Sequence, residues 1–83
     1  METRYEKEAI KTLRKIQPKL AKAIQAKIEE FASNGAKSNA DIKPLQGTLS
    51  GFRLRYGSWR VLMYIHGDEL IIHAIKPRGD AYK

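Results

Sequence analysis

The sequence predicts an α+β fold in which an N-terminal helical hairpin packs on an antiparallel sheet meander. Up to about residue 34, apolar side chains recur every three or four positions, which is the spacing of a helix face. From residue 52 they recur at every second position, and glycine-containing pairs interrupt them, as in strands joined by tight turns. Because the helices precede the strands, we expect them to cover one face of the sheet and to leave the other at least partly open.

Two short amphipathic helices account for the first part of the chain. Residues 6–16 carry apolar side chains at positions 9, 10, 13 and 16. Gln17-Pro18 ends this helix, and Pro18 can begin the next one, because a helix start leaves its first N–H groups unpaired. The second helix ends near Ser33-Asn34-Gly35. Residues 1–5 can form a short edge strand before the helices, and residues 36–44 show no periodicity and are expected to form a loop.

Three antiparallel strands are expected at residues 52–56, 59–66 and 69–76, with turns at Gly57-Ser58 and Gly67-Asp68. No internal repeat or linker divides the chain. Its 83 residues leave room for one domain, residues 1–83, with a thin hydrophobic core.

The hairpin of residues 52–64 places three arginines on one face of the sheet. With a two-residue turn at Gly57-Ser58, the opposite pairs are Tyr56–Trp59, Arg55–Arg60 and Arg53–Leu62. The other face is apolar along both strands, through Phe52, Leu54, Tyr56, Trp59, Val61 and Met63. Like charges that face each other across strands repel. A solvated strand face is the simpler interpretation, but the third arginine favours an anionic ligand.

The same register, continued through the second turn, gives the pairs His66–Glu69, Tyr64–Ile71, Leu62–His73 and Arg60–Ile75. His73 and Tyr64 would then share the open face with the arginines. The tail that leaves the last strand adds Lys76, Arg78 and Tyr82, which can fold back over the rim of this face. For His73 a half-buried structural role, and for Tyr82 a role in packing the C-terminus, are the alternatives.

Composition narrows the classes of function. The formal net charge is +7 and the pI is near 9.9, which favours nucleic acid or another acidic partner. The absence of cysteine excludes disulfides, thiolate zinc sites and thiol nucleophiles. We expect no metal and no cofactor. No apolar run has membrane-spanning length, so a cytoplasmic protein without membrane contact is expected.

Phosphodiester chemistry fits these side chains better than glycoside or acyl chemistry. Arginine binds phosphate through paired, charge-assisted hydrogen bonds and keeps its charge at any physiological pH. Preorganised cations stabilise a dianionic phosphorane more than the monoanionic ground state, which is the condition for catalysis. RNA supplies its own nucleophile, the 2′-hydroxyl, so that only a base and an acid are needed besides. Lys43, before Pro44, is a further candidate for phosphate contact.

Four segments, in this order and spacing, carry a resemblance to a known family. They are residues 5–16, Ile42-Lys-Pro-Leu-Gln-Gly47, the hairpin of residues 52–64, and Arg78-Gly-Asp-Ala-Tyr82. In them the chain resembles the RelE/ParE superfamily of toxins from bacterial type II toxin–antitoxin modules, and most of all its RelE-like branch. The resemblance covers nearly the whole chain and implies a RelE-like fold.

The resemblance implies a metal-independent, ribosome-dependent endoribonuclease that inhibits translation by cutting messenger RNA within the codon. At the matching positions, Arg53 and Arg55 neutralise phosphate and Arg60 stabilises the transition state. A basic tail residue, Lys76 or Arg78, assists the leaving group, and Tyr82 is a general-base candidate that needs nearby cations to lower its pKa. Many relatives have His-Arg in the tail, where this chain has Pro77-Arg78. His73 is a candidate to replace the missing histidine.

The partners implied by the resemblance are a cognate antitoxin, the ribosome and mRNA. The antitoxin would fold a flexible segment across the basic face or displace the tail. Operator DNA would be bound only through the toxin–antitoxin complex. Two alternatives belong to other classes of function. One is a ParE-like inhibitor of DNA gyrase without nuclease activity, and the other is a non-catalytic protein that acts only as an antitoxin-bound corepressor.

Overall fold

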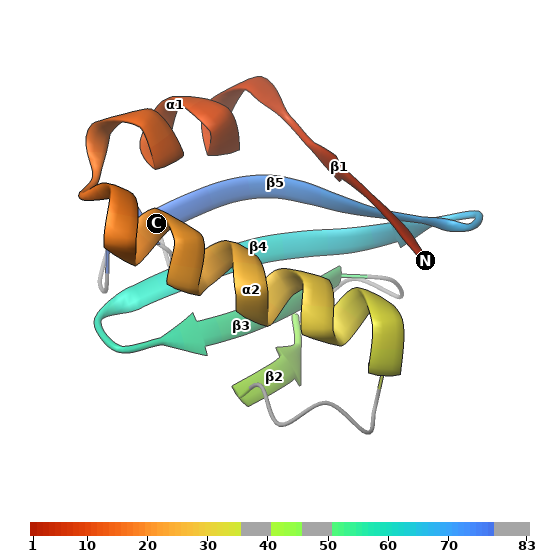
Figure 1. Cartoon of the computed structure of the whole chain (residues 1–83). Coiled ribbons are helices and arrows are strands. Elements are labelled where there is room, and N and C mark those ends of the chain that lie inside the picture. The colour runs from red at the N-terminus through yellow and green to blue at the C-terminus, as the bar shows by residue number, and fades with distance from the viewer. Residues whose placement is uncertain (36–40, 46–50, 78–83) are drawn as a thin grey trace.

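Two helices and five strands follow one another in the computed structural model, which describes residues 1–35, 41–45 and 51–77 (Figure 1). The first strand leads into both helices, and the remaining four strands follow. In chain order the elements are β1 (Glu2–Tyr5), α1 (Lys7–Lys15), α2 (Pro18–Asn34), β2 (Asp41–Pro44), β3 (Gly51–Tyr56), β4 (Trp59–His66) and β5 (Glu69–Pro77).

The strands form one mixed sheet in the order β1-β5-β4-β3-β2. The expected meander is its centre, since β3, β4 and β5 pair antiparallel in sequence. The short N-terminal edge strand is also confirmed, and it runs parallel to β5. The expectation of a loop over residues 36–44 was wrong for Asp41–Pro44, which pair with β3. This strand has four residues and lies at an edge of the sheet, where a proline can be accommodated.

Helix α2 lies across one face of the sheet, where it closes the core (Figure 1). Ile24 and Ile28 of this helix are fully buried, as are Leu54 and Ile72 in the strands. The helix also places Phe31 against Phe52 of β3, with ring centroids 5.7 Å apart at an interplanar angle of 59°. The hairpin's predicted apolar face therefore packs into the core.

Helix α1 follows β1 in the chain and packs mainly against β5. Ala9 is its buried contact with the core, whereas Ile10 is 38% exposed, so the apolar side of α1 is narrower than its sequence suggests. Gln17 is extended, as a residue before proline must be, and Pro18 is the first residue of α2. In the described part of the chain, neither helix is long and apolar enough to cross a membrane.

Two tight turns set the register of the meander. Gly57 and Gly67 have φ values of 58° and 61°, the left-handed region in which a side chain is unfavourable, and both stand first in their two-residue turns. The predicted pairs Arg55–Arg60, Arg53–Leu62 and Tyr56–Trp59 are confirmed. So are the pairs nearest the second turn, His66–Glu69 and Tyr64–Ile71.

Beyond these pairs the predicted register of β5 was wrong, because the ladder is irregular between Leu62 and Met63. Met63 is opposite Ile72, but Leu62 is opposite Ala74 instead of His73, so His73 is the extra residue of a bulge. Arg60 is therefore opposite Lys76 and not Ile75. Ile75 instead enters the core at 2% exposure, opposite Val61.

Truncating Leu54 should remove a central contact of this core. Leu54 is fully buried in β3. We expect Leu54→Ala to lower the free energy of unfolding by about 3 kcal/mol, because the site loses apolar contacts and retains a cavity. Ile10→Ala is the control, with an expected change below about 0.5 kcal/mol, since Ile10 is exposed. Urea unfolding followed by circular dichroism measures both, and equal effects would contradict the described core.

Candidate functional site

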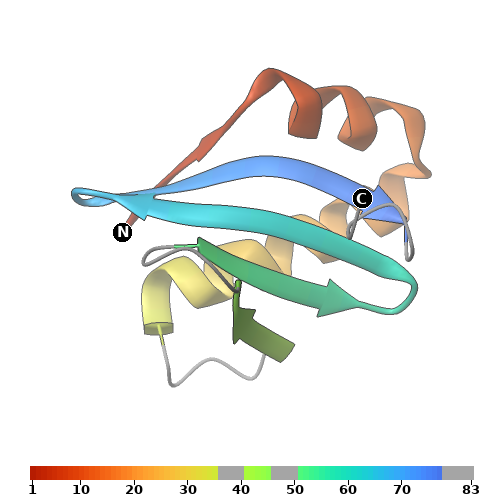
Figure 2. The ribbon, with the colours of Figure 1, turned by 180° about the vertical axis from the view of Figure 1, so that it is seen from behind.

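The face of the sheet turned away from α2 carries a cluster of cations. Seen from behind, β3, β4 and β5 face the viewer, and neither described helix crosses them (Figure 2). Arg55, Arg60 and Lys76 are opposite one another on β3, β4 and β5. Two residues from Arg55 along β3, Arg53 is opposite Lys43 of β2. We call these five residues the basic face.

The bulge at His73 brings Lys76 onto the basic face. Without it, strand alternation would turn Lys76 toward the core and Ile75 outward. With it, Lys76 lies on the strand opposite Arg60 and is exposed. The sequence suggested Lys76 only as a tail residue that folds back over the rim, and the actual position results from pairing.

Arg60 is a buried cation, with only 6% of its surface exposed. Its Nη1 donates hydrogen bonds to the carbonyl oxygens of Gly57, at 3.2 Å, and of Trp59, at 3.0 Å. These acceptors hold the side chain at the turn but carry no full negative charge. Its Nε is buried and has no hydrogen-bond partner among the described residues. A buried donor left unpaired is costly, and an anion would relieve that cost.

The tail residues Arg78 and Tyr82, predicted to take part in the site, lie outside the described residues. Their predicted roles therefore stay predictions. The same holds for Gly47 of the Ile42–Gly47 motif, whose other end forms β2.

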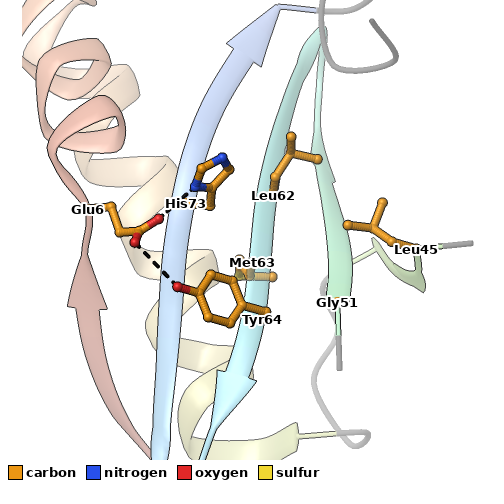
Figure 3. Close-up of a pocket in the computed structure, with 7 residues that line it drawn as sticks. All are labelled: Glu6, Leu45, Gly51, Leu62, Met63, Tyr64 and His73. Carbon is orange, nitrogen blue, oxygen red and sulfur yellow. Dashed lines mark hydrogen bonds and ion pairs between the residues drawn. The ribbon is translucent and has the colours of Figure 1, made fainter. Parts of the chain in front are cut away.

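A second cluster, which we call the Glu6 cluster, joins Glu6, Tyr64 and His73 beside the basic face (Figure 3). Glu6 Oε1 is 2.6 Å from His73 Nδ1, and its Oε2 accepts a hydrogen bond from the Tyr64 hydroxyl at 3.3 Å. Tyr64 and His73 were expected on the open face, but Glu6 was missed. Its sequence position suggested only the start of a helix, and the parallel pairing of β1 with β5 brings it beside His73.

The Glu6 cluster lines a pocket of about 480 Å³. Leu45, Gly51, Leu62 and Met63 complete the lining, so the pocket is largely apolar with a polar group at one side (Figure 3). Leu62 is opposite Arg53, which belongs to the basic face. The pocket thus lies directly beside the phosphate-binding candidates.

Neighbouring groups and desolvation shift the pKa values of two residues of the Glu6 cluster. The bond from His73 lowers the pKa of Glu6, and the nearby His73, Tyr64 and Arg4 act in the same direction. Desolvation and the Glu6 carboxylate raise the pKa of Tyr64. Glu6 is therefore ionised and Tyr64 neutral near pH 7.

These groups suit an anionic, nucleotide-sized ligand. Arginines and lysines bind phosphate oxygens, and an apolar pocket with a tyrosine can hold a base or sugar. Among residues 1–35, 41–45 and 51–77, no group of three His, Asp or Glu side chains could hold a metal ion.

Comparison with known sequences gives two matches over nearly the whole chain. The sequence profile of a family described as "ParE toxin of type II toxin-antitoxin system, parDE" matches residues 3–82. Toxin RelE3 of Methanocaldococcus jannaschii is 26% identical over 84 residues, which cover 99% of this chain and 96% of that protein.

Solved structures show the same fold. In the RelB-RelE antitoxin-toxin complex from Methanococcus jannaschii, one chain matches with a TM-score of 0.78 at 28% identity, over 94% of this chain and 93% of that one. In the RelE-RelB complex from Pyrococcus horikoshii OT3, a chain matches with a TM-score of 0.77 at 20% identity, over 94% of both. The predicted α+β, RelE-like fold is thereby confirmed.

Removing the Glu6 charge should change how stability depends on pH. The pKa of Glu6 is lowered below its ordinary value of 4.5, so the ionised carboxylate stabilises the fold above that pH. This contribution is lost as the pH falls through the lowered value. We expect Glu6→Gln to melt slightly below wild type at pH 7, and this small difference to shrink once acidification protonates the carboxylate of Glu6.

Thermal unfolding by circular dichroism between pH 3 and pH 7 measures this difference. Glu2→Gln is the control, because Glu2 is an exposed glutamate on β1, opposite Glu69 and away from His73. A gap between Glu6→Gln and wild type that widened on acidification would contradict the assignment.

Proposed function

Because the chain belongs to the ParE toxin family of type II toxin–antitoxin systems, we propose that this toxin is a metal-independent endoribonuclease that cleaves mRNA on the ribosome. Within the RelE/ParE superfamily it is a toxin of RelE type, similar to Toxin RelE3 over nearly its full length. The residues of the basic face are the structural support for proposing RNA cleavage.

The row of Arg55, Arg60 and Lys76 is the observation that most supports this reaction. Side chains directly opposite one another on a sheet face have Cβ atoms roughly 5 Å apart, so these three cations can contact one phosphate group. Arg60 has a like charge opposite it on each neighbouring strand, and an anion bound beside it would reduce this repulsion. A phosphorane carries more charge than a phosphodiester, so the row stabilises the transition state more than the substrate.

The cleavage step needs no group outside the RNA and the protein. The 2′ oxygen attacks the adjacent phosphorus and loses its proton to a base. The bond from phosphorus to the 5′ oxygen then breaks, and that oxygen takes up a proton. The products are a 2′,3′-cyclic phosphate and a 5′-hydroxyl. Arg53 and Lys43 would hold neighbouring phosphates, Lys76 or Arg78 would assist the leaving group, and Tyr82 is the base that the family resemblance suggests.

An antitoxin is the proposed protein partner. The similar chains from M. jannaschii and P. horikoshii were crystallised as complexes of RelE with RelB. An antitoxin segment on the basic face of this chain would meet a dense positive charge, which favours an acidic segment that orders on binding. Binding of operator DNA would occur only in that complex.

A gyrase inhibitor is the second candidate function. The matching family is described as the ParE toxin. The resemblance to the RelE/ParE superfamily implies that a ParE-like member blocks DNA gyrase without cleaving nucleic acid. A gyrase inhibitor would not require Arg60 in its buried position or Lys76 opposite it. We therefore favour RNA cleavage.

Primer extension on cellular mRNA after brief induction of the toxin distinguishes the candidates. We expect new 5′ ends inside translated codons, because cleavage depends on mRNA in the ribosome. DNA breaks with intact mRNA would identify a gyrase inhibitor, and neither lesion would point to a non-catalytic corepressor.

Replacing Arg60 should strongly slow cleavage. Arg60→Lys keeps the charge but loses the planar fork that can hold two phosphate oxygens, so we expect the cleavage rate to fall by about 100-fold or more. Single-turnover cleavage of mRNA on programmed ribosomes gives the rate, and circular dichroism verifies the fold. Arg14→Lys is the matched control. Arg14 is exposed on α1, so this variant should cleave mRNA at the wild-type rate. Full activity of Arg60→Lys would refute this role.

A further inference from the structure

We propose that His73 is the general base of the cleavage reaction and that Glu6 is its positioning residue. This inference rests on the proposed ribonuclease function and assigns its base to a strand residue, in place of the tail residue Tyr82.

The bulge on β5 gives His73 an orientation that an ordinary strand residue lacks. It is the extra residue between Ile72 and Ala74, which are opposite Met63 and Leu62, so it has no direct cross-strand partner. Its side chain is 58% exposed and borders the pocket. Bulges often direct a side chain toward a functional site.

Glu6 is fixed beside His73 by both its backbone and its side chain. Its backbone N–H donates to the carbonyl oxygen of Ile72 at 2.9 Å, next to His73 in sequence. Its two carboxylate oxygens contact His73 and Tyr64 separately. Glu6 lies at the N-cap position of α1, yet its side chain makes no capping bond, so the carboxylate is available to His73.

The geometry assigns the ring nitrogens of His73. An ionised Glu6 accepts a hydrogen bond from Nδ1, so Nδ1 carries the hydrogen and Nε2 of the neutral ring can accept a proton. Nε2 lies on the far side of the ring from Glu6, toward Leu62 (Figure 3). Leu62 is opposite Arg53, so Nε2 is turned toward the basic face.

This arrangement completes the proton transfer. Nε2 takes the proton of the 2′-hydroxyl as the bond between the 2′ oxygen and phosphorus forms. The resulting imidazolium is stabilised by the Glu6 carboxylate at 2.6 Å, as a carboxylate stabilises the histidine of a hydrolase triad. The 5′ oxygen leaves and takes a proton from water, and the imidazolium later returns its proton to solvent. Tyr64 and Arg4 also face Glu6, and their interactions keep it ionised.

A purely structural pair would behave differently. Exposed ion pairs contribute little to stability, and both partners here are more than one-third exposed. Losing such a pair would leave the chemical step unchanged, whereas losing a base slows it by about 100-fold to 10,000-fold.

Single-turnover cleavage of mRNA on programmed ribosomes, at saturating toxin, tests the proposal. We expect the cleavage rates of His73→Gln and His73→Ala to fall by about 100-fold or more. Added imidazole should restore part of the His73→Ala rate. Glu6→Gln should slow cleavage about tenfold in the wild-type background but change nothing in His73→Gln, because it acts only through His73. The toxin concentration that gives half-saturation should be unchanged. His66→Gln is the matched control. His66 is exposed at the end of β4, so this variant should cleave mRNA at the wild-type rate.

Wild-type cleavage by a folded His73→Gln protein would overturn the proposal while leaving the ribonuclease function intact. So would an equal effect of Glu6→Gln in both backgrounds, since that indicates a role independent of His73. If wild-type toxin itself cut no mRNA on ribosomes, the proposed function would fail, and the base assignment with it.

Discussion

The bulge at His73 in the β4–β5 ladder is the constraint on which the rest of this molecule depends. Up to Ile72, the strand alternates normally, with Leu70 and Ile72 in the core. One extra residue reverses the alternation, so that Ile75 fills the core and Lys76 turns to the opposite face. A regular ladder would place Lys76 toward the apolar core, where an unpaired charge is very unfavourable. The core and the basic face therefore both require the same irregularity.

The two faces of the sheet contribute to stability in opposite directions. On one face, α2 and the alternating apolar residues of the strands remove their surfaces from water, which stabilises the fold. On the other face, Arg60 lies between Arg55 and Lys76, and like charges that face each other across strands repel. The burial of apolar surface in the core offsets this repulsion. This row of cations is the part of the toxin that suits the anionic ligand proposed above.

Most of the fold and half of the candidate site were predictable. The periodicity indicated α2, the three central strands and the pairs Arg55–Arg60 and Arg53–Leu62, because helix faces and two-residue turns are local features. The strand β2 was missed because four residues that end in proline carry no local signal. Glu6 was missed because its partner His73 is 67 residues away in sequence.

The sequence by itself determined the fold class, the family resemblance and three arginines on one hairpin face, because each follows from spacing within a few residues. Only the tertiary structure decided that Lys76 lies opposite Arg60 and that Glu6 contacts His73. Both depend on pairing between distant strands, one through a bulge and one through the parallel pairing of β1 with β5. Such pairing is settled by packing of the whole core, which no local pattern in the chain expresses.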